Sequence, residues 1–213
     1  MGLKRKMPEF KIHNLWPTPI YENNFSLDEN GIKYIKNITY ERMATDNGFI
    51  SIDRYLLNDN KLSSLKKEID LHVENYTKRF LDVKDNAEFY MLNSWATRHD
   101  SGDWCQPHYH GSSLISGVYY LDVPENSGNI VFQRMSSHIN LFHSSINIEY
   151  NNENYVNEDL QDFNVKKGDI LLFPSHLMHK IRKNLSNEPR YSLAFNYFVR
   201  GKFGAKEYEL EIK

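Results

Sequence analysis

Residues 168–179, GDILLFPSHLMH, contain the clearest indication of the fold. This stretch begins with a glycine, continues as a short apolar run, turns at Pro174 and ends on His179. A short apolar run between turn signals is typical of a buried β-strand. The pattern therefore predicts a strand over Asp169–Phe173, a turn, and a second strand that starts with His179.

Similar short segments recur from residue 87 onward, rich in aromatic and β-branched residues and separated by turn signals. The other predicted strands are Glu88–Arg98, Leu114–Val123, Asn129–Gln133, Ile146–Tyr150, Asp162–Val165 and Tyr191–Val199. Many short strands at such spacing indicate a sandwich or barrel, a group that includes jelly rolls and cupins. Residues 135–160, rich in Asn and Ser, are expected to form a long loop or an irregular hairpin.

The first 86 residues follow different patterns. Residues 8–26 contain two prolines and are predicted to be extended, whereas residues 27–83 are predicted to be helical. Apolar residues recur at helical spacing in two stripes, Ile32 to Ile38 and Leu62 to Phe80, and both are expected to face the core. We expect one mainly β domain over residues 1–213, with an extended and helical part at 8–86 and a β core at 87–200.

Composition argues against several classes of partner. The 26 Lys and Arg residues nearly balance the 28 Asp and Glu residues, and the net charge of -2 does not favour nucleic acid or an anionic membrane. The single cysteine, Cys105, cannot form an intrachain disulfide. No apolar stretch approaches the roughly 18 residues of a membrane helix, and the basic start lacks the apolar run of a secretory signal. We therefore expect a cytoplasmic protein.

The pair His108-Tyr109-His110 stands out among the nine histidines. On a strand, side chains alternate between faces, so two histidines two residues apart point the same way and could share a metal. Such a pair is also common by chance. Its significance comes from His179, because two imidazoles and a third ligand on one octahedral face are typical of non-haem iron. His99 lies near this region but has no partner at metal spacing.

Two known families share these motifs. The spacings Gly102-x5-His108-x-His110 and Gly168-x5-Pro174-x4-His179 resemble the two cupin motifs. That match is partial, because Leu114 and Ile115 occupy the places where a cupin glutamate is expected.

The chain more closely resembles the 2-oxoglutarate/Fe(II) oxygenase superfamily, in particular a subfamily of bacteria and their phages. The matching segments occur in the family's order: Leu15–Ile20, Asn93–Trp95, His108–His110, Leu114–Leu121, Phe173–Ser175 with His179, and Arg190–Asn196. The resemblance covers most of the chain. It implies a double-stranded β-helix, the cofactors Fe(II) and 2-oxoglutarate, and a dioxygenase of the hydroxylase type, working in a bacterium or a phage-infected host.

The resemblance also implies the site. His108 and His179 would hold the metal, and His110 stands where the superfamily usually has a carboxylate, so it is either the third ligand or a neighbour of the ligands. Arg190 lies eleven residues after His179 and is followed by x-Ser192, as in the superfamily.

A guanidinium can donate two parallel hydrogen bonds to a carboxylate. Because Arg190 and Ser192 lie on the same face of a strand, both are expected to bind the distal carboxylate of 2-oxoglutarate. Tyr120 either donates a hydrogen bond to the same carboxylate or is an aromatic residue of the core. Asn93 and Trp95 are expected to line the pocket, although packing is the better interpretation of Trp95. No catalytic residue beyond the metal site is expected.

Two alternatives remain open at this stage. One is a cupin-like metalloenzyme with three histidines that does not use 2-oxoglutarate, in which Arg190 has no cosubstrate role. The other is a β-helix module without enzymatic activity. The expected partner is a small-molecule or peptidyl substrate, and the sequence does not indicate an oligomeric state.

Overall fold

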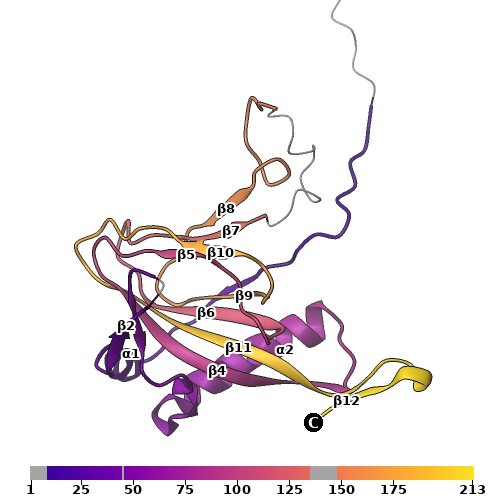
Figure 1. Cartoon of the computed structure of the whole chain (residues 1–213), viewed down its shortest axis with the longest axis horizontal. Helices are drawn as coiled ribbons and strands as arrows, with labels where there is room; N and C mark the ends of the chain where they lie inside the picture. The colour runs from indigo at the N-terminus through magenta and orange to yellow at the C-terminus, as the bar shows by residue number, and fades with distance from the viewer. Residues whose placement is uncertain (1–8, 45, 135–147) are drawn as a thin grey trace, which may run out of the picture.

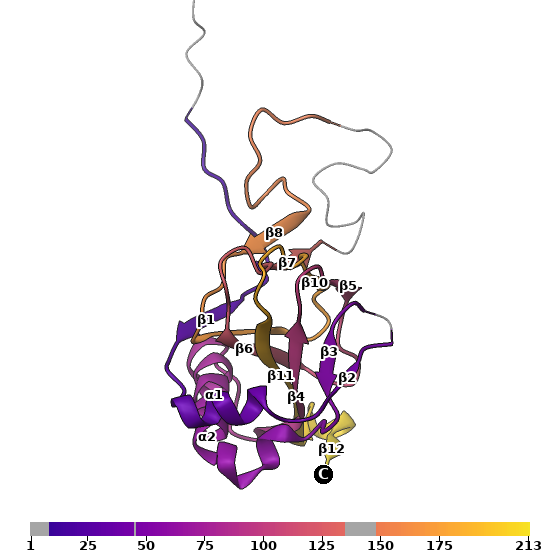
Figure 2. The ribbon, with the colours of Figure 1, turned by 90° about the vertical axis from the view of Figure 1, so that its left-hand side faces the viewer.

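Two antiparallel sheets face each other, and helices cover the outer face of the larger one (Figures 1 and 2). The structure is a computed structural model and describes residues 9–44, 46–134 and 148–213. In order across the larger sheet, the strands are β1 (Tyr21–Asn24), β9 (Asp169–Pro174), β6 (Ile115–Asp122), β11 (Arg190–Phe203), β4 (Ala87–His99), β3 (Phe49–Ser51) and β2 (Tyr40–Arg42), and β12 (Leu210–Ile212) pairs with β11. The smaller sheet contains β5 (Cys105–His108), β10 (His179–Ile181), β7 (Ile130–Gln133) and β8 (Leu160–Phe163).

The helices belong to the N-terminal part of the chain. Helix α1 spans Glu29–Lys36, and its N-terminus is capped by Asp28, whose side chain accepts a hydrogen bond from the Gly31 amide. Helix α2 spans Ser63–Glu74 and continues as a π-helical turn over Asn75–Phe80. Short 3-10 turns lie at Leu56–Asn58, Asn60–Leu62 and Lys206–Tyr208. None of the helices in the described ranges is long and apolar enough to cross a membrane.

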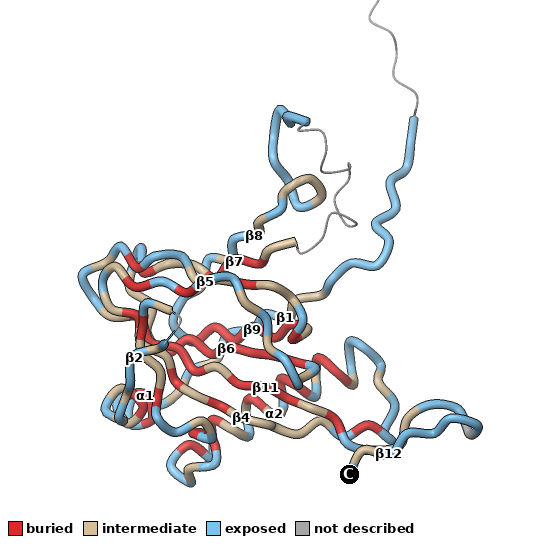
Figure 3. The backbone as a smooth tube through the Cα atoms, in the orientation of Figure 1, coloured by how far each residue is buried: buried red, intermediate tan, exposed pale blue. Residues whose placement is uncertain are grey.

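Alternation along the central strands separates two cores. Figure 3 shows that buried residues are concentrated along the central strands β6, β9 and β11. The odd-numbered residues of β11 from 191 to 197 pack with α2 in the first core, on the outer face of the larger sheet. The second core lies between the sheets and contains Val118, Tyr120, Ile130, Phe132, Leu171 and Phe173. Because successive side chains of a strand point to opposite faces, the even-numbered residues of β11 from 190 to 196 face the space between the sheets. We call this side of the larger sheet its interior face.

The prediction of a mainly β protein with packed helices is confirmed, but two local predictions are wrong. Residues 27–83 are not helical throughout, since β2 and β3 form a hairpin that joins the larger sheet beside β4. Each of these strands has three residues, too few to show alternation, and pairing with a strand distant in sequence stabilises them. The predicted strand Ile146–Tyr150 lies partly outside the described residues, and its described part, 148–150, is not a strand.

Two leucines on α2 test the role of the first core. Leu65 is 1% exposed within this core, and Leu71, on the opposite side of the same helix, is 53% exposed. We expect Leu65→Ala to lower the free energy of unfolding by about 2–5 kcal/mol, because it removes buried methyl groups and leaves a cavity. Leu71→Ala should change it by less than about 0.5 kcal/mol. Urea unfolding followed by circular dichroism measures both, and equal losses would contradict this assignment of the core.

Candidate functional site

Three histidines from the predicted motifs meet between the sheets. His179 opens β10 and lies opposite His108, the last residue of β5, in an antiparallel pair. His110 follows β5, and its amide donates to the carbonyl of Ser175 at 2.9 Å. The ring centroids are 4.3 Å apart for His108 and His179, 5.3 Å for His108 and His110, and 5.1 Å for His110 and His179.

One possible ligand atom from each of these rings lies within 4.8 Å of the others, so the cluster is able to hold a single metal ion. The convergence of these histidines agrees with the motif-based expectation, but the local structure differs. The strand ends at His108, so His110 lies two residues beyond it, where its amide is bound to the carbonyl of Ser175.

The local backbone orients two of the three rings. Nδ1 of His108 lies 2.9 Å from the carbonyl oxygen of Gln106, and Nδ1 of His179 lies 2.9 Å from the carbonyl oxygen of Leu177. A carbonyl only accepts hydrogen bonds, so each Nδ1 must carry the proton, and each Nε2 keeps a lone pair for a metal. Burial, followed by the nearby His108, lowers the pKa of His179 to about 3, which keeps this ring in its neutral, metal-binding form.

A polar network orients the third ring. Asn196, on the interior face of β11, donates from Nδ2 to Oδ1 of Asn93 at 2.9 Å, so its own Oδ1 points the other way. That oxygen lies 2.7 Å from Nδ1 of His110, and the Ser116 hydroxyl lies 2.9 Å from the same nitrogen. The amide oxygen requires a proton on Nδ1 of His110, which leaves Nε2 of this ring free. This network orients the ring of His110 in the way that hydrogen-bond partners orient histidines that bind a metal.

A buried cation lies deeper between the sheets. Arg190 is fully buried, and its Cζ lies 5.0 Å from the ring centroid of Tyr120, which is also fully buried. Neither the three guanidinium nitrogens nor the Tyr120 hydroxyl has a hydrogen-bond partner. Burial lowers the pKa of Arg190 and raises that of Tyr120 to about 12. Since a buried, unpaired charge is costly, these donors fit an anionic ligand such as a carboxylate.

The remaining predicted residues have varied positions. Ser192 is on the interior face of β11, and its hydroxyl lies 2.8 Å from that of Thr97 on β4. Trp95 lines the cavity, with its ring centroid 5.6 Å from that of His110. Asn93 contacts Asn196 behind His110 instead of lining the cavity. Cys105 borders the cavity, but burial raises the pKa of its thiol, so it remains protonated and is a poor nucleophile.

Sequence reasoning missed His99. It lies on β4 opposite Arg190, is 3% exposed, and lines the cavity with neither ring nitrogen hydrogen-bonded. Burial and the charge of Arg190 lower its pKa to about 3. A signal did exist, because His99 is four residues after Trp95 and therefore on the same face of a strand. A search for metal spacing overlooks a histidine of this kind.

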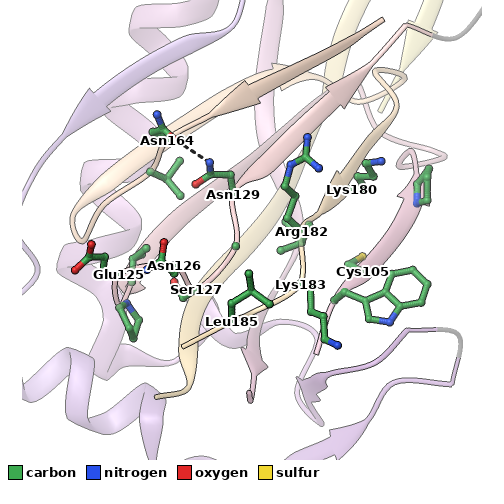
Figure 4. Close-up of a pocket in the computed structure, with 17 residues that line it drawn as sticks. Cys105, Glu125, Asn126, Ser127, Asn129, Asn164, Lys180, Arg182, Lys183 and Leu185 are labelled. Atoms are coloured by element: carbon green, nitrogen blue, oxygen red, sulfur yellow. Dashed lines mark hydrogen bonds between the residues drawn. The ribbon is translucent and has the colours of Figure 1, made fainter. Parts of the chain in front are cut away.

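Two hollows are present in the described part of the chain. The cavity with the histidines has a volume of about 540 Å³, and the hairpin between β2 and β3 contributes to its wall through Glu41, Arg42, Met43, Ala44 and Asp46. A hollow of about 820 Å³ is also present, and Figure 4 shows its lining residues. There, Arg182 is already paired with Asp162, and Asn129 with Asn164. The smaller cavity is therefore the better candidate for chemistry, because three histidines converge there and His99 in its wall has no hydrogen-bond partner.

Comparisons with known proteins agree with this geometry. Residues 93–196 match a family model described as "Putative 2OG-Fe(II) oxygenase". The chain is similar to an oxidoreductase of the 2OG-Fe(II) oxygenase family from Burkholderia pseudomallei, with a TM-score of 0.56 and 13% identity over 80% of this chain and 79% of that one. No curated protein matches the chain.

Two other solved structures have the same fold. HygX from Streptomyces hygroscopicus, with nickel and 2-oxoglutarate bound, has a TM-score of 0.57 and 13% identity over 85% of this chain and 83% of its own. SnoN, a non-haem α-ketoglutarate-dependent epimerase from nogalamycin biosynthesis, has a TM-score of 0.58 and 12% identity over 85% and 78%. At this level of identity, the likeness confirms the double-stranded β-helix predicted from the sequence.

Fold and site together define a non-haem metalloprotein built on a double-stranded β-helix. The family match is more specific, and the region 93–196, which contains the three histidines and Arg190, belongs to the 2-oxoglutarate/Fe(II) oxygenase superfamily. Its cofactors are therefore Fe(II) and 2-oxoglutarate, as predicted. The three-histidine cluster and the unpaired buried guanidinium fit this pair of groups.

Asn196 provides a test of the network behind His110. We expect Asn196→Ala to weaken Ni(II) or Fe(II) binding about 10- to 100-fold, because Nδ1 of His110 loses the acceptor that fixes its proton. Asn129→Ala is a matched control, because Asn129 hydrogen-bonds to Asn164 away from the histidines. Metal titration by calorimetry measures both variants. Unchanged affinity in Asn196→Ala would show that the network does not support the ligand.

The buried His99 predicts a pH effect on the stability of the metal-free protein. The unfolded chain takes up a proton at His99 near pH 6.5, whereas the folded protein does so only near pH 3. The free energy of unfolding should therefore decrease as the pH falls below 6.5, by about 1.4 kcal/mol per pH unit from this group. Urea unfolding at several pH values measures the slope. His99→Leu should remove this contribution, while that of His179 remains, and an unchanged slope would contradict the prediction.

Proposed function

We propose that the protein is a hydroxylase in which His108, His110 and His179 hold Fe(II) through Nε2, and Arg190 binds the distal carboxylate of 2-oxoglutarate. The observation that carries this proposal is the pairing of two features between the same two sheets: three imidazoles with free Nε2 atoms, and a buried guanidinium without a partner. The whole chain, residues 1–213, forms the catalytic domain in this proposal.

The protein's own groups orient the two cofactors. Backbone carbonyls and Asn196 fix the tautomers of the three histidines, so no proton has to move before the metal binds. Arg190 neutralises the distal carboxylate, Tyr120 donates its hydroxyl to it, and Ser192 lines the same face. Apolar side chains such as Val118 and Phe173 exclude water from the cavity. When bound, iron and 2-oxoglutarate supply the oxidising chemistry, in which dioxygen converts 2-oxoglutarate to succinate and carbon dioxide while the substrate is oxidised.

The third histidine changes the charge of the site. The superfamily usually places a carboxylate two residues after the first histidine, and this chain has His110. Three neutral imidazoles leave one negative charge fewer next to the metal. We therefore expect weaker metal binding and an altered redox potential compared with a site that has two histidines and a carboxylate.

A small molecule is the substrate class that we propose. In support, the cavity of about 540 Å³ is in the usual size range for small-molecule sites. Of the similar folds, HygX has been solved with hygromycin B bound, and SnoN with nogalamycin RO. A peptidyl side chain remains the second candidate. The alternative of a three-histidine enzyme without 2-oxoglutarate gives no role to the unpaired Arg190, so this residue favours the oxygenase.

Turnover of 2-oxoglutarate tests the proposal. We expect Fe(II)-dependent release of succinate, even without substrate at a low rate. Arg190→Ala should reduce it at least about 100-fold, since the carboxylate loses its counter-charge. His179→Ala should abolish metal binding and turnover. Arg182→Ala is the matched control, because this arginine pairs with Asp162 at the surface. Iron binding without succinate release in the native protein would favour the cupin-like alternative, and no metal binding would favour a non-enzymatic module.

A further inference from the structure

Buried polar atoms without partners gather at one place in the molecule. In the described ranges, ten buried side-chain nitrogen or oxygen atoms have no hydrogen-bond partner. Six of them belong to only three residues: Arg190, Tyr120 and His99. Folded proteins satisfy nearly all buried polar groups, and each unpaired donor costs free energy. A cluster of such atoms therefore indicates a ligand with several acceptor atoms.

Strand order places these three residues side by side. Strands β6, β11 and β4 are neighbours in the larger sheet, with β11 in the middle. Arg190 on β11 lies directly opposite His99 on β4, and Tyr120 on β6 lies opposite Ser192, two residues further along β11. Arg190 is thus flanked by an imidazole from one neighbouring strand and by a phenol hydroxyl from the other.

The hairpin of β2 and β3 covers the imidazole of His99. A Cβ atom at Gly48, in this hairpin, would lie 2.9 Å from Cδ2 of His99 and 3.0 Å from Nε2. Such contacts are shorter than a side chain tolerates, so glycine at position 48 allows the hairpin to pack against the ring. The ring is 3% exposed, yet it lines the cavity that contains the three other histidines.

Within residues 9–44, 46–134 and 148–213, no charged group supplies the missing acceptor. Burial, followed by the charge of Arg190, lowers the pKa of His99 to about 3 and keeps the ring neutral. A neutral imidazole always carries one N–H donor. No carboxylate among the described residues accepts a hydrogen bond from Arg190, Tyr120 or His99. The acceptor for this donor is therefore expected from outside the protein.

We propose that His99 is a binding residue for 2-oxoglutarate, donating one N–H to the distal carboxylate that Arg190 holds. This inference rests on the proposed function, and adds a residue to which neither the motifs nor the family match assigns a role. A carboxylate offers about four lone-pair sites. The fork of Arg190 takes two of these, the hydroxyl of Tyr120 takes a third, and the N–H of His99 takes the fourth.

Calorimetric titration of the full-length, Ni(II)-loaded protein with 2-oxoglutarate tests the proposal without turnover. His99→Leu removes the donor and stays apolar, His99→Gln keeps an N–H donor, and Arg190→Ala reports on the cosubstrate site itself. His72→Leu is the matched control, because His72 is a buried histidine that hydrogen-bonds to Tyr21 in the other core. Ni(II) affinity is measured for each variant as a separate readout.

We expect His99→Leu to weaken 2-oxoglutarate binding about 10- to 100-fold, the loss of one hydrogen bond to a charged group, with Ni(II) affinity unchanged. His99→Gln should retain most of the affinity, and His72→Leu should retain all of it. Native affinity in His99→Leu, together with weak binding in Arg190→Ala, would overturn the role of His99 but leave the proposed function intact. Native affinity in Arg190→Ala would overturn both proposals.

Imidazole ¹⁵N signals provide a second measurement that does not require His99→Leu to fold. The His99 signals are assigned by their absence in the spectrum of His99→Gln. Saturation of the native, Zn(II)-loaded protein with 2-oxoglutarate should shift the protonated nitrogen of His99, because it gains an anionic acceptor. The signals of His72 should stay in place. Unchanged His99 signals at saturation would overturn the proposal.

Discussion

The antiparallel pairing of β5 with β10 is the constraint on which the candidate site depends. It aligns His108 with His179, two residues far apart in the chain, and sets their ring centroids 4.3 Å apart. Because side chains alternate along a strand, a shift of this register by one residue would turn one histidine to the outer face. The next residue along β10, Lys180, shows the result of such a shift, since it lines the other hollow, which contains none of the three histidines (Figure 4).

The same alternation divides the larger sheet into a structural and a functional face. On β11, Leu193 and Phe195 pack against α2, whereas Arg190 and Ser192 face the smaller sheet. Burial on the outer face stabilises the fold. The interior face instead contains a buried guanidinium without a partner, an arrangement that lowers stability. Native proteins retain such costly groups at functional sites, where a ligand satisfies them.

The three-histidine cluster and the buried donors are complementary in charge. Three neutral imidazoles do not neutralise any of the positive charge of a divalent metal. Arg190 is a second positive group in the same space. A dicarboxylate that contacts both would meet attraction at each end. The network of Asn93, Asn196 and Ser116 makes this possible, because it fixes the proton on His110 without adding a negative charge.

Local periodicity and short motifs were enough to predict the positions of the main β-strands along the chain, the two apolar stripes of the helices and the three histidines. The sequence also located Arg190 through its offset from His179. Tertiary structure alone decided the rest. The strands β2 and β3 are too short to show a period; they pair with each other, and β3 joins the sheet by pairing with β4.

The position of His110 depends on a backbone hydrogen bond to Ser175 beyond the end of β5. The low exposure of His99 depends on the hairpin that covers its ring. Packing also decides which hydrogen-bond donors lack a partner. Whether a buried donor is paired depends on the atoms that surround it in the fold, and these come from distant parts of the chain.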